Sequence, residues 1–215
     1  MLLSRLEFCS LLSYTPHPEN DVQRKTKDYV YDLKSDKQTG TPSIPITMDI
    51  ARNIANNISI RFGNLFGSDV ILIPVPSSTL KKSEDLWVPY NLAKALESKG
   101  LGKVIACVKQ KNAIPKSATS RPEDRATAQQ HYDSLVIEGV VPAMKRIVLI
   151  DDVVTRGATA IGVASRLKDA YPDADIRLFA AVRTMSNAKE FKEFVEPCIN
   201  GTIRLLQNGQ TRRHP

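Results

Sequence analysis

The distribution of apolar residues along the chain predicts a protein in which strands alternate with helices. Short runs rich in Val, Ile and Leu lie at residues 69–75, 104–109, 146–150 and 176–182. Runs of this length, bounded by charged or turn-forming residues, are typical of strands buried on both faces of a parallel sheet. An alternating pattern at residues 28–33 predicts a further short strand.

Between these runs, apolar residues recur at helical spacing. The segments 46–62, 88–99, 160–170 and 187–194 are predicted helices. In the first of them, the apolar side chains that share one helix face are Ile50, Ile54, Ile58 and Phe62. Strands that alternate with helices fold into a parallel sheet with helices on both faces. The sequence therefore predicts an α/β protein with a doubly wound, mostly parallel sheet.

The run at 146–150 is followed at once by polar residues. Asp151 and Asp152 come first, and the small, hydroxyl-rich segment 155–159 then leads into a helix. A helix start presents free backbone N–H groups and the positive end of its dipole, and Gly157 lets the backbone approach an anion closely. Two carboxylates repel a phosphate but suit a sugar diol or a divalent metal. This order predicts a phosphate site beside a sugar or metal site.

The end of the run at 69–75 is also polar. Because the carboxyl ends of parallel strands meet at one edge of a sheet, we expect these residues to lie near Asp151. Seen alone, these residues indicate an ordinary polar turn; their position one strand and helix ahead of Asp151 favours a binding loop. The residues concerned are Pro76, Ser77, Ser78, Thr79, Lys81 and Lys82.

The segment 146–170 resembles the signature by which type I phosphoribosyltransferases bind phosphoribosyl pyrophosphate (PRPP): a strand followed by Asp-Asp-Val-Val-Thr-Arg-Gly-Ala-Thr. The alternative is a chance pair of acids before an ordinary helix start. A narrower resemblance is to the ComF-like branch of this superfamily, without the cysteine-rich zinc module with which ComF proteins commonly begin. A direct role in DNA uptake is therefore not expected. The segments that carry this narrower resemblance are 31–34, 73–76, 90–93 and 125–132.

The resemblance implies an enzyme that binds PRPP and Mg²⁺ and transfers the 5-phosphoribosyl group to an unidentified, nucleobase-like acceptor, releasing pyrophosphate. It implies ribose binding by Asp151 and Asp152, which would hold the metal indirectly or through the substrate. The residues implied for the 5′-phosphate are Thr155, Arg156, Gly157, Ala158 and Thr159. The residues implied for pyrophosphate are Pro76, Ser77, Ser78, Thr79 and Lys81. Dimers are common in the family, so a homodimer is a further expectation.

Residues 110–131 are polar and lack apolar periodicity, which predicts a long loop. Phosphoribosyltransferases of this type close a flexible loop over bound PRPP, which keeps water from the reacting sugar. The candidate residues in this loop are Lys116, Arg121, Arg125, Gln129 and His131. His131 has the chemistry of a general acid or base near neutral pH, or of a structural hydrogen-bonding residue.

Length and composition fit one α/β core, with 215 residues and 42% apolar content. We expect an N-terminal extension with a small hood or cap at 1–68, a phosphoribosyltransferase-like core at 69–200 and a flexible tail at 201–215. The apolar start of the chain is interrupted by charge within a few residues, so neither a signal peptide nor a membrane span is expected. The widely spaced cysteines predict neither a disulfide framework nor a zinc site and fit a reducing cytoplasm: Cys9, Cys107 and Cys198.

The net charge of +7 adds a second hypothesis. Basic residues gather between positions 99 and 125 and again in the tail, which suits a polyphosphate ligand or, with weaker support, nucleic acid. The chain could therefore be a non-catalytic module that senses PRPP or a nucleotide and regulates a nucleic-acid-processing or defence partner. Fold class does not choose between these functions.

Overall fold

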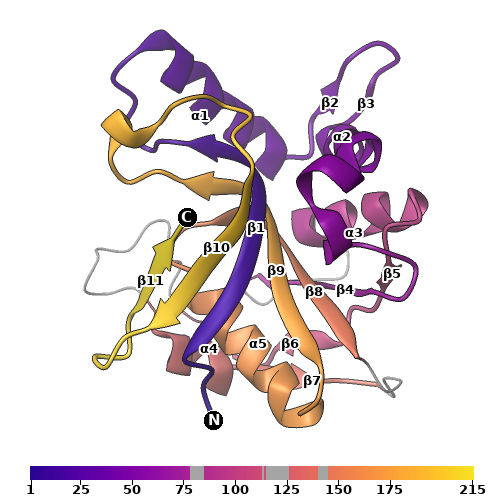
Figure 1. The fold of residues 1–215 in the computed structure, drawn as a ribbon, viewed down its shortest axis with the longest axis vertical. Helices are drawn as coiled ribbons and strands as arrows, with labels where there is room; N and C mark the ends of the chain where they lie inside the picture. Colours follow the sequence, from indigo (N-terminus) through magenta and orange to yellow (C-terminus); the bar gives the residue numbers. More distant parts are fainter. Residues whose placement is uncertain (78–84, 113, 115–125, 140–144) are drawn as a thin grey trace.

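The computed structural model describes residues 1–77, 85–112, 114, 126–139 and 145–215, and for residues 58–61 it describes the backbone alone. In this part of the chain, a mixed sheet of seven strands forms the centre of the molecule (Figure 1). In spatial order the strands are β11 (Thr211–His214), β10 (Cys198–Leu205), β1 (Arg5–Tyr14), β9 (Asp175–Thr184), β8 (Arg146–Val154), β4 (Ile71–Pro74) and β5 (Lys103–Val104). The strands β1, β9, β8, β4 and β5 are parallel to one another, whereas β10 and β11 are each antiparallel to their neighbours.

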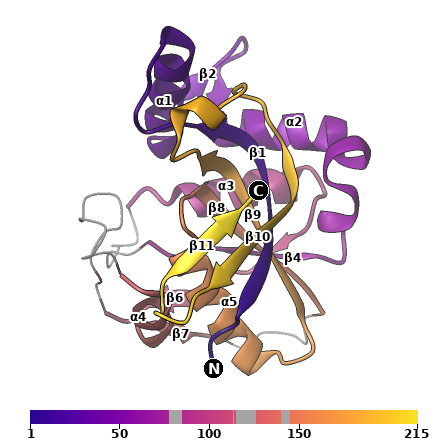
Figure 2. The same cartoon turned by 60° about the vertical axis from the view of Figure 1, so that its left-hand side comes forward.

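Helices cover both faces of this sheet (Figures 1 and 2). On one face lie α1 (Asp21–Lys34), α2 (Ile46–Arg61) and α3 (Val88–Ser98), and on the other lie α4 (Ala128–Asp133) and α5 (Ala158–Ala170). The predicted α/β class with a mostly parallel sheet is confirmed. Within the described ranges, no helix is both long and apolar enough to cross a membrane. The short elements are η1 (Gly63–Leu65), η3 (Ala188–Glu190), β2 (Gln38–Thr39), β3 (Ile44–Pro45), β6 (Val108–Gln110) and β7 (Leu135–Ile137).

The most apolar runs of the sequence form the centre of the sheet. The predicted strands at 69–75, 146–150 and 176–182 fall on β4, β8 and β9. Leu72 of β4 and Leu149 of β8 are both fully buried, because helices cover both sides of these strands. The predicted helices at 46–62, 88–99 and 160–170 are observed as α2, α3 and α5, and their apolar faces pack onto these strands.

Three weaker local predictions are wrong. Residues 28–33, predicted as a strand, belong to α1, which Asn20 caps by accepting a hydrogen bond from the backbone N–H of Gln23 at 2.9 Å. The buried face of α1 includes the polar side chains of Gln23 and Thr26, which concealed its helical period in the sequence. The run at 104–109 divides between β5 and β6, and in the predicted helix at 187–194 only the short η3 forms.

The amino-terminal residues are part of the core sheet. β1 lies between β9 and β10, pairing in parallel with β9 and antiparallel with β10. Leu6, Phe8, Leu11 and Leu12 on this strand are between 1% and 4% exposed. A boundary at residue 68 therefore separates β1 from the sheet to which it belongs.

The prediction of a flexible tail at residues 201–215 is also wrong. These residues supply most of β10 and all of β11, which pair with each other from Thr202 with His214 to Leu205 with Thr211. The hairpin lies at one edge of the sheet (Figure 1) and leaves many polar side chains exposed. Its hydrophobic pattern is therefore too weak to reveal two strands, although Ile203 is fully buried.

Candidate functional site

A cavity of about 530 Å³ lies at the carboxyl end of β4 and β8. Pro74 of β4 pairs with Ile150 of β8, and the backbone N–H of Val75 donates to the carbonyl of Ile150 at 2.8 Å. The polar residues that follow each strand therefore share one cavity. Its walls include Pro76, Ser77, His131, Asp151, Asp152, Thr155, Arg156, Gly157, Ala158 and Thr159, all predicted from the sequence, together with Tyr14, Lys34, Trp87, Gln210 and Thr211.

The two acids lie within β8, because this strand continues to Val154 instead of ending at residue 150. The Asp151 carboxylate oxygen Oδ1 accepts a hydrogen bond from the backbone N–H of Asp152 at 2.9 Å, and Asp152 Oδ1 accepts one from Val153 at 2.8 Å. Burial, and then the negative charge of Asp152, raise the pKa of Asp151 well above its ordinary value. Asp151 therefore keeps its proton to a higher pH than an exposed aspartate.

A lysine from α1 forms an ion pair with one of the two acids. Lys34 Nζ lies 3.4 Å from Asp152 Oδ2, and the Asp152 side chain is only 18% exposed. Burial opposes the charge on Lys34, but the negative groups beside it, chiefly Asp152 and then Asp151, together raise the pKa of Lys34 above its ordinary value. Spacing along the chain does not predict this contact, because Lys34 is distant in sequence from the acids. In the sequence it was visible only as part of the resemblance at 31–34.

The segment 155–159 forms the tight turn from β8 into α5. Gly157 has φ of +86°, in the left-handed region, and precedes the helix without a side-chain cap. A Cβ at Gly157 would lie 2.5 Å from Cδ1 of Ile203, so only glycine fits this position. The uncapped amides of the first turn of α5 border the cavity, where they favour an anion. We call residues 155–159 the phosphate loop, after the ligand that the sequence predicts for them.

His131 is not a loop residue, which corrects that prediction. It lies on α4, where it is 1% exposed, and its Nε2 is 3.2 Å from Thr159 Oγ1 of the phosphate loop. Burial lowers the pKa of His131 from 6.5 to about 4, so the ring is neutral at pH 7. Close packing on α5 explains the burial, because a Cβ at Gly162 would lie 2.7 Å from the His131 Cβ. His131 therefore contacts the segment 155–159 through the Thr159 hydroxyl.

Gln129 also lies on α4 instead of on a loop. A capping box begins this helix, in which Thr127 accepts from Gln130 and the Gln130 side chain accepts from the Thr127 backbone. The exposed Gln129 donates to Asp133 Oδ1 at 2.9 Å and is not among the residues that line the cavity. The remaining predicted site residues lie outside the described ranges: Ser78, Thr79, Lys81, Lys116, Arg121 and Arg125.

The cavity also has an aromatic wall, which was not predicted from the sequence. Trp87 donates from Nε1 to the carbonyl of Val75 at 2.9 Å and stacks on Tyr90, with ring centroids 5.4 Å apart and an interplanar angle of 19°. This places an indole beside the residues that follow β4. Trp87 is the single tryptophan of the chain, which was the available signal. A flat aromatic surface of this kind can stack against a nucleobase.

Comparison with known proteins gives distant structural similarity alone. No protein-family model and no curated protein matches the chain. A hypoxanthine phosphoribosyltransferase from Staphylococcus aureus is 12% identical over 79% of this chain and 83% of its own, with a TM-score of 0.38. A hypoxanthine phosphoribosyltransferase from Trypanosoma cruzi is 8% identical over 80% and 88%, with a TM-score of 0.34. A purine phosphoribosyltransferase from Pyrococcus horikoshii is 14% identical over 68% and 91%, with a TM-score of 0.33. Similarity at this level does not assign a function.

Proposed function

We propose that the protein is a phosphoribosyltransferase that binds PRPP with Mg²⁺ and transfers its 5-phosphoribosyl group to a nucleobase-like acceptor. The observation that carries this proposal is that one cavity brings together an acid pair, a helix start that favours an anion and the polar residues that follow β4. The phosphate loop, the two acids, Pro76 and Ser77 all line this cavity. A cavity of about 530 Å³ is of the size that encloses a small ligand.

Each chemical group of PRPP suits a different set of the residues that line the cavity. The amides at the start of α5 and the Thr159 hydroxyl suit the 5′-phosphate. The acid pair suits the ribose diol, because carboxylate oxygens accept hydrogen bonds from sugar hydroxyls. The pyrophosphate then falls toward Pro76 and Ser77. In the transfer, an acceptor nitrogen forms a bond to C1′ of the ribose, the bond from C1′ to the pyrophosphate oxygen breaks, and the acceptor loses a proton.

The donor set also fits Mg²⁺. This ion is commonly held by one or two carboxylates together with substrate phosphates and water, and Asp151 and Asp152 provide such a pair. In the described residues, no cluster of three or more His, Cys, Asp or Glu side chains could hold a metal without help from a ligand. When bound, Mg²⁺ neutralises charge on the leaving pyrophosphate. The protein itself positions the sugar and binds the 5′-phosphate and the pyrophosphate on either side of it.

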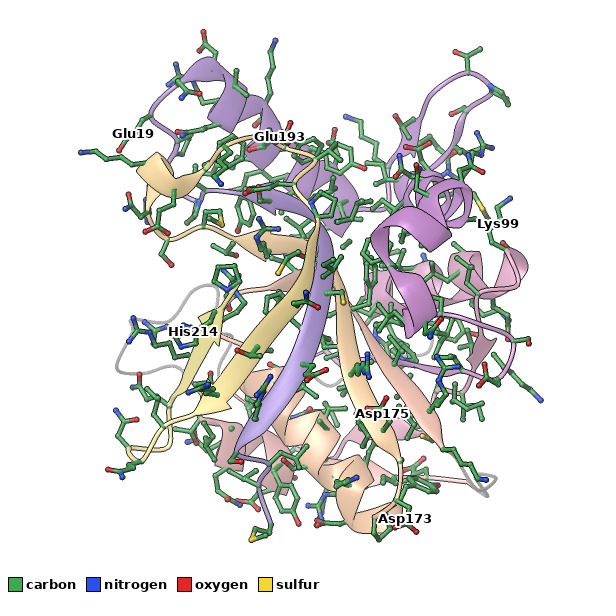
Figure 3. All side chains as sticks on the ribbon, viewed as in Figure 1. Glu19, Lys99, Asp173, Asp175, Glu193 and His214 are labelled. Carbon is green, nitrogen blue, oxygen red and sulfur yellow. The ribbon has the colours of Figure 1, made fainter. Side chains whose placement is uncertain are left out.

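Calorimetric titration with PRPP, with and without Mg²⁺, tests the proposal. We expect metal-dependent binding that is lost in the double variant Asp151→Asn, Asp152→Asn, because two amides cannot replace the charged acid pair. The matched control is Asp173→Asn with Asp175→Asn, which should bind like the wild type. These exposed acids (labelled in Figure 3) lie near the start of β9, where Asp175 pairs with Arg146 at the opposite end of β8 from the acid pair. Unchanged affinity in the first double variant would refute the site.

The net charge of +7 favours the second candidate, a module that senses PRPP or a nucleotide and regulates a partner. Binding alone does not separate this function from catalysis. A screen of nucleobases for pyrophosphate release does, since a sensor binds PRPP without releasing pyrophosphate. Nucleic acid that copurifies and is removed by high salt would favour a nucleic-acid partner.

A further inference from the structure

The carboxyl-terminal hairpin of β10 and β11 packs directly against the phosphate loop. Ile203 of β10 is fully buried and occupies the space beside Gly157, where a Cβ would lie 2.5 Å from its Cδ1. In the hairpin, Ile203 pairs with Arg213 of β11. Two neighbouring positions of one hairpin therefore reach the same loop.

The Arg213 guanidinium joins the phosphate loop to the end of β9. Its Nε donates to the carbonyl of Thr155 at 2.9 Å, and its Nη2 donates to the carbonyl of Thr184. Thr155 is the first residue after β8, and Thr184 is the last residue of β9. A planar guanidinium that bonds both of them fixes the direction in which the loop departs from β8.

Arg213 lies beside an aromatic ring and a second arginine. The guanidinium lies 5.5 Å from the centroid of the Phe8 ring, and burial, followed by the charge of nearby Arg183, lowers the pKa of Arg213 from its ordinary value. Arg183 itself pairs with Glu196, with 2.9 Å between Nη2 and Oε2. Arginine stays protonated in proteins, so Arg213 adds positive charge beneath the loop.

The same hairpin also contributes to the cavity wall. Gln210, which precedes β11, and Thr211, its first residue, both line the cavity. Gln210 Oε1 accepts a hydrogen bond from Arg156 Nη1 at 3.4 Å. Thr211 is 5% exposed, and its buried hydroxyl has no hydrogen-bond partner among the described residues.

We propose that Arg213 is a positioning residue for the 5′-phosphate: it holds the Thr155 peptide so that the amides after Gly157 face the ligand. This inference rests on the proposed function. In this role Arg213 makes the carboxyl-terminal strand β11 part of the binding site. The affinity for a ligand with a sugar 5-phosphate then depends on Arg213, whereas the affinity for pyrophosphate alone does not.

The test compares three variants with the wild type. Arg213→Met removes the donors and keeps an unbranched apolar stem, Arg213→Lys keeps the charge with fewer donors, and Arg212→Met alters the exposed neighbour as a control. Calorimetry gives the affinity for ribose 5-phosphate, PRPP and Mg²⁺-pyrophosphate, amide hydrogen exchange reports residues 156–160, and thermal unfolding monitors the fold.

We expect Arg213→Met to weaken ribose 5-phosphate and PRPP binding by at least about tenfold, since hydrogen bonds from a charged donor typically contribute this much. Mg²⁺-pyrophosphate affinity should stay unchanged, exchange at 156–160 should become faster, and Arg213→Lys should lie in between. Arg212→Met should match the wild type in every measurement.

Other outcomes overturn the inference. Equal weakening of all three ligands together with a lower melting temperature would mean that Arg213 only stabilises the fold. Unchanged ribose 5-phosphate affinity in Arg213→Met would also refute its role. If the wild type bound neither PRPP nor ribose 5-phosphate, the proposed function would fail, while unchanged exchange at 156–160 in Arg213→Met would separately refute the positioning of the loop.

Discussion

Gly157 shows how a single residue sets the shape of the phosphate loop. Its φ of +86° is costly for any residue with a Cβ, and its neighbour Ile203 leaves no room for one. Two independent constraints therefore require glycine: the left-handed backbone and the close approach of β10. The sequence could predict the first from the loop motif, whereas the second depends on a strand that is distant in sequence.

Replacing Gly157 by alanine tests both constraints. The left-handed conformation should cost about 1–2 kcal/mol, and the clash with Ile203 should add to it. We expect a lower melting temperature and weaker ribose 5-phosphate binding by calorimetry. The control is Gly100→Ala, which has φ of +73° but open space around its Cβ, and should lose some stability without losing affinity. Equal affinity in Gly157→Ala and the wild type would contradict the assigned loop geometry.

His131 predicts a pH dependence of stability. Its pKa falls from 6.5 to about 4 on folding, because burial disfavours the charged ring. The unfolded chain therefore binds a proton between pH 6.5 and 4 that the folded chain does not, and stability is lost as the pH falls through this window. The shift corresponds to a loss on the order of 3 kcal/mol.

Urea unfolding between pH 4 and 7 measures this effect. His131→Gln should remove the part of the pH dependence that His131 causes, whereas the control His214→Gln, at an exposed position on β11, should keep the wild-type profile. Matching profiles for the wild type and His131→Gln would show that His131 is not the responsible group.

At the scale of elements, α1 brings a cation to acids that belong to β8. Asp152 lies 3.4 Å from Lys34, and the positive charge of Lys34 also lowers the pKa of Asp151 against the larger effects that raise it. Removing this charge should therefore raise the pKa of Asp151 further. Because α1 was mispredicted, its contribution to the site could not be derived from the pattern of residues 28–33.

Carbon-13 NMR titration of the aspartate carboxyl groups tests the role of α1. Lys34→Met should move the Asp151 titration to higher pH, because the uncharged side chain no longer favours the carboxylate. Lys37→Met is the matched control, since Lys37 pairs with Asp32 outside the cavity, at 3.1 Å. An unchanged Asp151 titration in Lys34→Met would refute the coupling.

β8 is longer than its apolar run, because it continues to pair with the neighbouring strand β9. The apolar run predicts a strand that ends at Ile150, but Asp151, Val153 and Val154 continue to pair with β9. The acids are consequently held by sheet hydrogen bonds instead of lying on a free loop. Hydrophobicity alone could not reveal this extension, because strand pairing is satisfied by backbone groups whatever the side chain.

At the scale of the whole molecule, the two ends of the chain complete one sheet. β1 lies between β9 and β10, so a segment limited to residues 69–200 lacks β1, β11 and part of β10. We expect this segment to lack cooperative thermal unfolding, because β9 loses its neighbour and the core loses the side chains of Leu6, Phe8, Leu11 and Leu12.

A second deletion provides the control. Residues 38–45 form the small hairpin of β2 and β3, and the chain closes beneath it through a hydrogen bond from the Ile46 backbone N–H to the Lys37 carbonyl at 3.0 Å. Replacing 38–45 by two glycines should leave cooperative unfolding intact by circular dichroism. Cooperative unfolding of the 69–200 segment would show that the core does not need its terminal strands.

The sequence by itself determined the α/β class, the central strands and the order of acids and phosphate loop, because a strand, its turn and the next helix are contiguous and carry a strong hydrophobic pattern. The tertiary structure alone brought Lys34, Trp87, Gln210 and Arg213 to that motif. These residues reach it through pairing and packing between distant segments, including a half-exposed edge hairpin whose pattern is weak. Backbone pairing and close packing at that edge, which leave little trace in side-chain hydrophobicity, decided how the site is completed.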